Sequence, residues 1–329
     1  SFAKVADCAP LERVYAEGSY TGPLIDTHLH IPSIPDAELG ASLDQLREES
    51  GEQPSMGLNI TMDDIACQLQ REGTQQAVAF FPIWPEIPEP MVEVVSRTMA
   101  RYPDLFAPFI MPPFHDDDPE GSPTVDAPTL QDMLAFDPEL FVGYGEIGLY
   151  ERKSGAAELL PDGERLMEIY PVLETEGIAA LYFHPGDGQA DNLARALKQF
   201  PEITFLVHGD QIQPSIESLM EGYPNIYFTM NDLYGDEWLL RPEVSKEEFL
   251  AYFENIEPLI KKDLKMYSGM IRRHPDRFMW GTDRGDVLWT YDAEVGQTLV
   301  DYARAFIGRL DPSLQENFAY KNAERVLSP

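Results

Sequence analysis

The chain has 329 residues, which is enough to bury a substantial core within one domain. Its 57 acidic residues outnumber 24 basic ones and give a formal net charge of -33, so nucleic acid and anionic lipid are unfavourable partners. Hydrophobic residues make up 43% of the chain, yet no apolar run approaches the roughly 20 residues that cross a bilayer. These properties exclude a membrane-spanning chain and indicate a globular one.

Short apolar segments alternate with helical patterns along the chain, as a parallel sheet with crossover helices requires. Eight strands of this kind are expected, at residues 24–30, 76–82, 106–111, 141–147, 179–184, 204–208, 226–230 and 278–283. They predict an α/β fold, a single-domain (β/α)8 TIM barrel. Its core spans about residues 22–329, with residues 1–21 as an N-terminal extension.

Helical periodicity and good helix formers occupy the segments between these strands. The expected helices are residues 62–72, 90–101, 162–176, 191–200, 212–221, 246–273 and 293–309. Two irregular stretches rich in Pro, Gly, Ser and Asp, residues 31–61 and 112–127, follow strands one and three. Loops that follow barrel strands lie over the catalytic face, so we expect these two to form a lid and a wall.

Four of the six histidines end predicted strands. His28 and His30 in "IDTHLH" are two residues apart on one strand, so both imidazoles point to the same face. Strands five and six end in "LYFHPG" and "FLVHGD", which supply His184 and His208. One strand-end histidine is commonly a hydrogen-bonded core residue, but four on the same rim indicate a shared site.

Two carboxylates complete this group. Asp283 ends the last strand in "FMWGTD", and Glu146 lies within the apolar, glycine-flanked "GYGEIGLY". A buried carboxylate is costly unless it meets a cation. Imidazole and carboxylate ligands suit Zn2+ and related divalent metals. We therefore expect a divalent metal cofactor, Zn2+ first, with Mn, Ni or Fe as alternatives, bound as one or two ions.

These motifs, together with "NAERVL" at the C-terminus, resemble the amidohydrolase superfamily, in particular its amidohydrolase-related (amidohydrolase 2) branch of metal-dependent barrel hydrolases. The resemblance covers residues 25–327. It implies that His28, His30 and Asp283 bind a first metal and that His184 and His208 bind a second. Glu146 stands where many relatives have a bridging carboxylated lysine, and "GEIGLY" is similar to the motif of TatD-type members. The number of ions stays open.

The expected function is hydrolysis of an ester, lactone, amide or phosphoester bond in a small molecule by activated water. A divalent metal lowers the pKa of bound water from about 15.7 toward 7. Asp283 is the expected catalytic residue, which takes the proton of that water and passes it to the leaving group. Candidate substrate contacts lie in the strand-end loops: Arg284, Trp84, Tyr182, Asn231 and His115.

Three other functions remain open. A non-oxidative, metal-dependent decarboxylase would use the same barrel, although Glu146 as a second-metal bridge favours hydrolysis. A TatD-like nuclease conflicts with the net charge of -33, and an inactive binding protein conflicts with the intact ligand set. Relatives often form homodimers, which the sequence neither requires nor excludes.

The location of the protein is open as well. Cys8 and Cys67 are too few for a thiolate metal cluster and can form at most one disulfide. The chain starts at Ser1 and shows no export signal, but a signal peptide could have been removed. Both a cytoplasmic and an exported location are therefore compatible with the sequence.

Overall fold

The computed structural model describes residues 8, 15–31, 61–111, 124–151, 158–231, 233, 244–285 and 288–327. Eight parallel strands form one sheet in sequence order: β1 (Ile25–His30), β2 (Gln76–Pro82), β3 (Phe106–Met111), β4 (Gly143–Gly148), β5 (Ala180–His184), β6 (Thr204–Val207), β7 (Ile226–Met230) and β8 (Phe278–Trp280). A parallel bridge between Leu29 and Arg284 joins the segment after β8 to β1. The predicted (β/α)8 barrel is confirmed.

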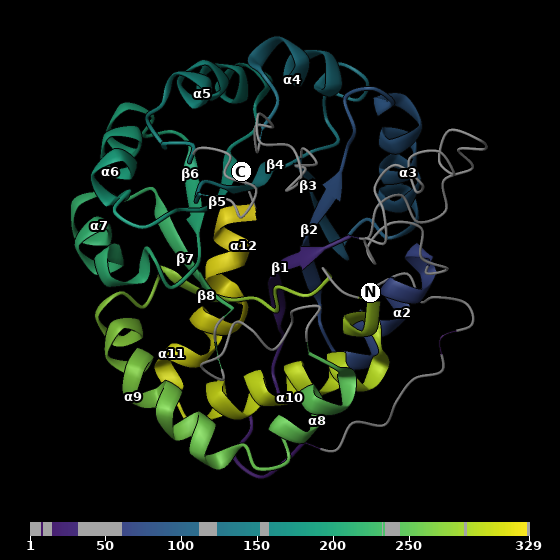
Figure 1. The fold of residues 1–329 in the computed structure, drawn as a ribbon. Coiled ribbons are helices and arrows are strands. Elements are labelled where there is room, and N and C mark those ends of the chain that lie inside the picture. The colour runs from purple at the N-terminus through teal and green to yellow at the C-terminus, as the bar shows by residue number, and fades with distance from the viewer. Residues whose placement is uncertain are drawn as a thin grey trace.

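Helices surround this sheet as a ring (Figure 1). Their bounds are α2 (Met62–Glu72), α3 (Pro88–Arg101), α4 (Ala127–Leu134), α5 (Glu164–Glu176), α6 (Ala190–Gln199), α7 (Ile216–Gly222), α8 (Lys246–Tyr252), α9 (Glu257–Arg273), α10 (Ala293–Gly308), α11 (Pro312–Glu316) and α12 (Asn322–Leu327). Short η1 (Gln213–Ser215) precedes α7, η3 (Leu288–Tyr291) precedes α10, and η4 (Asn317–Lys321) links α11 to α12.

Local chemistry explains where these helices begin and end. The Thr61 side chain accepts a hydrogen bond from the Asp64 amide in a capping box, and Gly73 ends α2 at φ 70°. The single helix predicted over residues 246–273 is wrong, because α8 ends and α9 begins afresh with Pro258 in its first turn. Proline lacks the amide proton that a helix interior needs, but it fits a first turn. Helix α4 was not predicted.

The core has two parts. Apolar side chains between the sheet and the outer helices form the larger one, and the barrel interior holds a smaller cluster that includes Phe80, Phe109 and Tyr182. Helix α12 covers the end where the strands begin, since the Asn322 side-chain amide donates to the carbonyl of Phe278 at 2.9 Å (Figure 1). Val326 packs against the interior cluster. The opposite end, where the strands finish, holds the histidine and carboxylate side chains of the candidate site.

Three further predictions concern parts of the chain away from the barrel. Cys8 and Cys67 form a disulfide that joins the N-terminal segment to α2. No helix among the described residues is both long and apolar enough to cross a membrane. Residues 32–60 and 112–123, which contain most of the expected lid and wall and also His115, lie outside the described residues.

Candidate metal centre

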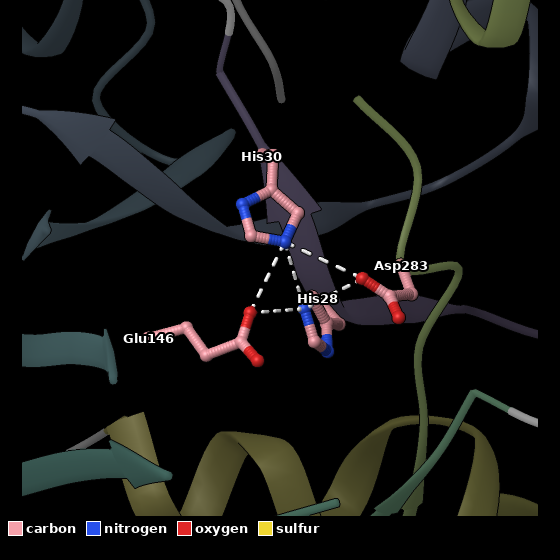
Figure 2. A group of neighbouring side chains, drawn as sticks. All are labelled: His28, His30, Glu146 and Asp283. Atoms are coloured by element: carbon pink, nitrogen blue, oxygen red, sulfur yellow. Dashed lines mark hydrogen bonds and ion pairs between the residues drawn. The ribbon is translucent and has the colours of Figure 1, made fainter. Parts of the chain in front are cut away.

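Four of the predicted ligands meet at the mouth of the barrel (Figure 2). His28 and His30 come from β1, Glu146 from β4, and Asp283 from the segment after β8. The Nε2 atom of His28 lies 3.0 Å from Oδ1 of Asp283 and 3.1 Å from Oε2 of Glu146. The Nε2 atom of His30 lies 3.3 and 3.1 Å from the same two oxygens. The side chains converge on one point.

The other two histidines form a second group around the same glutamate. His208 Nε2 lies 2.5 Å from Oε1 of Glu146, and His184 Nδ1 lies 3.6 Å from that oxygen. Each carboxylate oxygen of Glu146 thus faces one histidine pair, Oε2 the β1 pair and Oε1 the pair from β5 and β6. A carboxylate in this position can bridge two cations. The structure therefore brings all six predicted metal ligands together.

The donor atoms fit a divalent metal. Ligands about 2.0–2.2 Å from a tetrahedral zinc lie about 3.3–3.6 Å from one another. The atoms that His28, His30, Glu146 and Asp283 offer all lie within 4.8 Å of one another, as do those of Glu146, His184 and His208. Imidazole nitrogen and carboxylate oxygen are ligands that zinc and its first-row neighbours accept. The residues present can hold one ion in each group.

The carboxylates of the site are held ionised. Burial alone would raise the pKa of Glu146, but His208 and His28 outweigh it and leave that pKa well below its usual value. Burial likewise opposes ionisation of Asp283, and His28 above all lowers its pKa well below the ordinary value. Two anions packed against nitrogen ligands create a strong demand for positive charge.

The pKa values of the two most buried histidines, His28 and His208, shift in opposite directions. Burial disfavours the charged form of His28, but Asp283 and Glu146 outweigh it and raise its pKa to about 9. Burial is the main reason that the pKa of His208 falls to about 4, helped by the neighbouring His184 and His28 against the pull of Glu146. The β1 side of the site therefore favours a protonated imidazole, and the side formed by His208 favours a neutral one.

Backbone and buttressing contacts fix Asp283 and His28 in place. The Asp283 amide donates to the His28 carbonyl at 2.9 Å, and Asp283 itself adopts φ 53°, a conformation rare outside glycine. Asp26 accepts from the amides of His28 and Thr282 at 3.0 and 2.9 Å and from the Thr282 hydroxyl at 2.6 Å. Asp26 was not singled out from the sequence, although a charged residue inside an apolar strand next to "HLH" is a signal for it.

A glycine leaves room for His184. Gly209 follows His208 directly and has φ +97°, and a Cβ atom there would lie 2.6 Å from Nε2 of His184. Any other residue would both strain the backbone and push the imidazole away. The "HGD" sequence after strand six thus carries a packing requirement as well as a ligand.

Of the predicted substrate contacts, Asn231 lies at the site. Its Nδ2 atom donates to Oδ2 of Asp283 at 2.7 Å and lies 2.9 Å from Nδ1 of His208. Asn231 is 7% exposed and is positioned to orient two ligands. The predicted substrate role of Tyr182 is not supported, because its side chain is 0% exposed beneath the ligands, with its hydroxyl 3.0 Å from Nδ1 of His28.

The structure also gives no support for substrate binding by Arg284 or Trp84. Arg284 is 2% exposed, and its two terminal nitrogens each donate to an oxygen of Glu72 at 2.7 Å. It follows Asp283 in the chain but points to the outside of the barrel, toward α2. Trp84 is 7% exposed and packs in the core between the sheet and the helices. Burial excludes both side chains from the open mouth.

The fold and the site together define a (β/α)8 barrel with a cluster of histidines and carboxylates at the strand ends that could hold a metal ion. The sequence matches no family model and no curated protein. Among solved structures, it is similar to one of an amidohydrolase II at 12% identity and a TM-score of 0.54, over 93% of this chain and 100% of that one.

Two structures from Burkholderia multivorans are also similar in fold. An amidohydrolase with bound HEPES shares 14% identity and a TM-score of 0.53, over 93% of this chain and 99% of that one. N-isopropylammelide isopropylaminohydrolase shares 10% identity and a TM-score of 0.50, over 92% of this chain and 74% of that one. At these identities the likeness concerns the fold.

Proposed function

We propose that this protein is a metal-dependent hydrolase of the amidohydrolase type, which uses water to cleave an ester, lactone, amide or phosphoester bond of a small molecule. The observation that carries the proposal is the position of Glu146. Its Oε2 lies 3.1 Å from both β1 histidines, and its Oε1 lies 2.5 Å from His208. This arrangement is suited to a bridged pair of ions, with Zn2+ as the first candidate and Mn, Ni or Fe as alternatives.

A divalent ion in this site supplies Lewis acidity, which polarises the scissile group and lowers the pKa of a water molecule from about 15.7 toward 7. The protein supplies the positioning. His28 and His30 hold one side of the centre, and His184 and His208 hold the other. Because all four rings come from strand ends of one closed sheet, their separation is set by the barrel.

Asp283 is placed to move the proton. Its side chain is 33% exposed, more than that of any other of the six proposed ligands. Water can therefore reach it from the mouth of the barrel. Oδ2 accepts a hydrogen bond from Asn231 at 2.7 Å, which fixes the plane of the carboxylate. In the proposed reaction Asp283 takes a proton from the attacking water and delivers it to the leaving group.

The second candidate, a decarboxylase, needs one ion and no bridge. The two-sided contact of Glu146 favours hydrolysis over that alternative. A small-molecule substrate also fits the net charge of -33 better than a nucleic acid does.

The experiment is an activity screen of protein purified without chelator. Lactones, carboxylic esters, amides, phosphoesters and aromatic acids are tested with and without added zinc or manganese. We expect hydrolysis in one class that a chelator abolishes and added metal restores. His28→Ala should lose this activity, and His274→Ala, which changes a histidine outside the site, should keep it. Hydrolysis that survives both chelation and His28→Ala would contradict the proposal, and release of carbon dioxide alone would favour the lyase.

We also propose that the protein works in an oxidising compartment. Disulfides persist in such compartments and are rare in a reducing cytosol, and Cys8 and Cys67 are paired here. Thiol titration of unfolded protein from its native source tests this. No free thiol supports an oxidising location, and two free thiols per chain contradict it.

A further inference from the structure

A chain of side-chain hydrogen bonds leads from the metal centre into the barrel wall. It begins at Nδ1 of His28, which lies 3.0 Å from the hydroxyl of Tyr182. Burial raises the pKa of Tyr182 well above its usual value, and a hydrogen bond from the Thr229 hydroxyl opposes that rise. Oγ1 of Thr229 lies 3.1 Å from Oγ1 of Thr27, which donates to the carbonyl of Trp280 at 2.8 Å. Four strands, β1, β5, β7 and β8, contribute to it.

The direction of Nε2 indicates which ring nitrogen of His28 carries the proton. Nε2 faces the two carboxylates and is the atom that a metal ion in the proposed site would take, so the proton of the neutral ring belongs on Nδ1. The Tyr182 oxygen, 3.0 Å from Nδ1, is the acceptor for that proton.

This assignment matters because the other ring nitrogen faces the site. Nε2 of His28 is the atom 3.0 Å from Asp283 and 3.1 Å from Glu146. A neutral imidazole with its proton on Nδ1 presents a free lone pair at Nε2, as metal binding requires. With the proton on Nε2, that nitrogen could not bind a metal ion.

These hydrogen-bonded side chains are buried and closely packed. His28, Tyr182 and Thr229 are each 0% exposed, and Thr27 is 1% exposed, so water does not compete for these bonds. Gly281 allows the close approach of β1 and β7, since a Cβ there would lie 2.7 Å from Cβ of His28 and 2.8 Å from Cγ2 of Thr229. Phe80 contacts both the His28 and the Tyr182 rings edge-on and holds their planes.

From this geometry we infer that Tyr182 is a positioning residue: its oxygen accepts the Nδ1 proton of His28 and so fixes the tautomer in which Nε2 is free to bind metal. The inference rests on the proposed metal site and adds a role for a residue beneath it. Partners of this kind on a metal-binding histidine typically change metal affinity by about 10–100-fold when they are removed.

The test is the zinc affinity of Tyr182→Phe, measured by competition with a chromophoric chelator. Removal of the hydroxyl should weaken binding of the tighter zinc ion by about 10–100-fold, because Nδ1 loses its acceptor. Tyr302→Phe is the matched control, since its buried hydroxyl donates to Asp263 at 2.6 Å, away from the site. It should leave zinc affinity unchanged.

Two threonine variants separate positioning from a general loss of packing. Thr229→Val breaks the chain one step further out and should weaken zinc binding less than Tyr182→Phe does, and Thr229→Ser should retain the affinity. NMR of 15N-histidine-labelled zinc protein should show a protonated Nδ1 on His28, with faster exchange of that proton in Tyr182→Phe. Unchanged zinc affinity and proton exchange in Tyr182→Phe would overturn the inference. Failure of the wild type to bind zinc, manganese, nickel or iron would instead overturn the proposed function.

Discussion

Asp283 and Arg284 are neighbours in the chain but belong to different regions of the molecule. Asp283 lies in the mouth with its side chain 33% exposed, within 3.3 Å of two histidines. Arg284 is 2% exposed and forms a two-pronged ion pair with Glu72 on α2. The Arg284 pair balances its own charge with a permanently charged guanidinium, whereas the two carboxylates of the mouth face imidazoles, whose charge depends on protonation. The buried scaffold charge thus has a permanent partner, and the carboxylates of the candidate site have only titratable ones.

The largest expected effect on function comes from Asp283→Asn. Loss of the proton acceptor should lower turnover by about 10²–10⁴-fold. The fold should remain intact, because the change removes a negative charge from a cluster with an excess of them. Steady-state kinetics of the metal-loaded variant, with circular dichroism as a control for folding, measure this. Full turnover in Asp283→Asn would remove Asp283 from the mechanism.

The largest expected effect on stability comes from Glu72→Gln. It leaves the guanidinium of Arg284 buried without a counter-charge, so the free energy of unfolding should fall by about 3–5 kcal/mol. Urea unfolding measures the loss. The double variant Glu72→Gln with Arg284→Met removes both charges and should recover much of it. If Glu72→Gln alone is as stable as the wild type, the Arg284 pair is not part of the scaffold and the comparison fails.

A smaller effect on stability is expected at Thr282, whose hydrogen bond to Asp26 connects the segment after β8 to β1. Thr282→Val removes the hydroxyl that donates to Asp26 at 2.6 Å. A hydrogen bond to a buried charged group contributes about 1.5–3 kcal/mol, so unfolding should become easier by that amount. Thr298→Val is the control, because its hydroxyl donates to the Glu294 carbonyl on an exposed part of α10. If both variants lose the same free energy of unfolding, the hydrogen bond to Asp26 contributes no more than one on an exposed helix.

The smallest effect is expected for an ion pair at the surface. Arg273 donates from Nε and a terminal nitrogen to both oxygens of Glu217 at 2.7 and 2.8 Å, so this pair is also two-pronged, but its side chain is 59% exposed. Water screens such pairs, and the side chains lose entropy when they form. Arg273→Gln should therefore leave urea unfolding within measurement error. A loss as large as that of Glu72→Gln would mean that burial does not distinguish the two pairs.

Strand periodicity predicted much of the fold because each strand is a short apolar run and helical patterns lie between the runs. The ligands followed from the same signal, since His28, His30, His184 and His208 all stand where an apolar run stops. The direction of Arg284 could not be predicted in this way. Its partner Glu72 lies 212 residues away in the chain, and only the closed barrel brings the two together.

The role of Tyr182 could not be predicted from the sequence either. Its position near a strand end, two residues before His184, predicts a substrate contact. The side chain points into the barrel beneath His28, where its hydroxyl lies 3.0 Å from Nδ1 of that histidine. Sequence spacing gives the face of one strand, but the pairing of side chains across four strands depends on the register of the closed sheet.

The central claim is that the mouth holds divalent metal on both sides of Glu146. A crystal structure of zinc-soaked protein, with anomalous scattering recorded at the zinc edge, tests this most directly. The account predicts two anomalous peaks, one among His28, His30 and Asp283 and the other between His184 and His208, with Glu146 in contact with both. The absence of any peak at these six side chains, in protein shown to be folded, would contradict it.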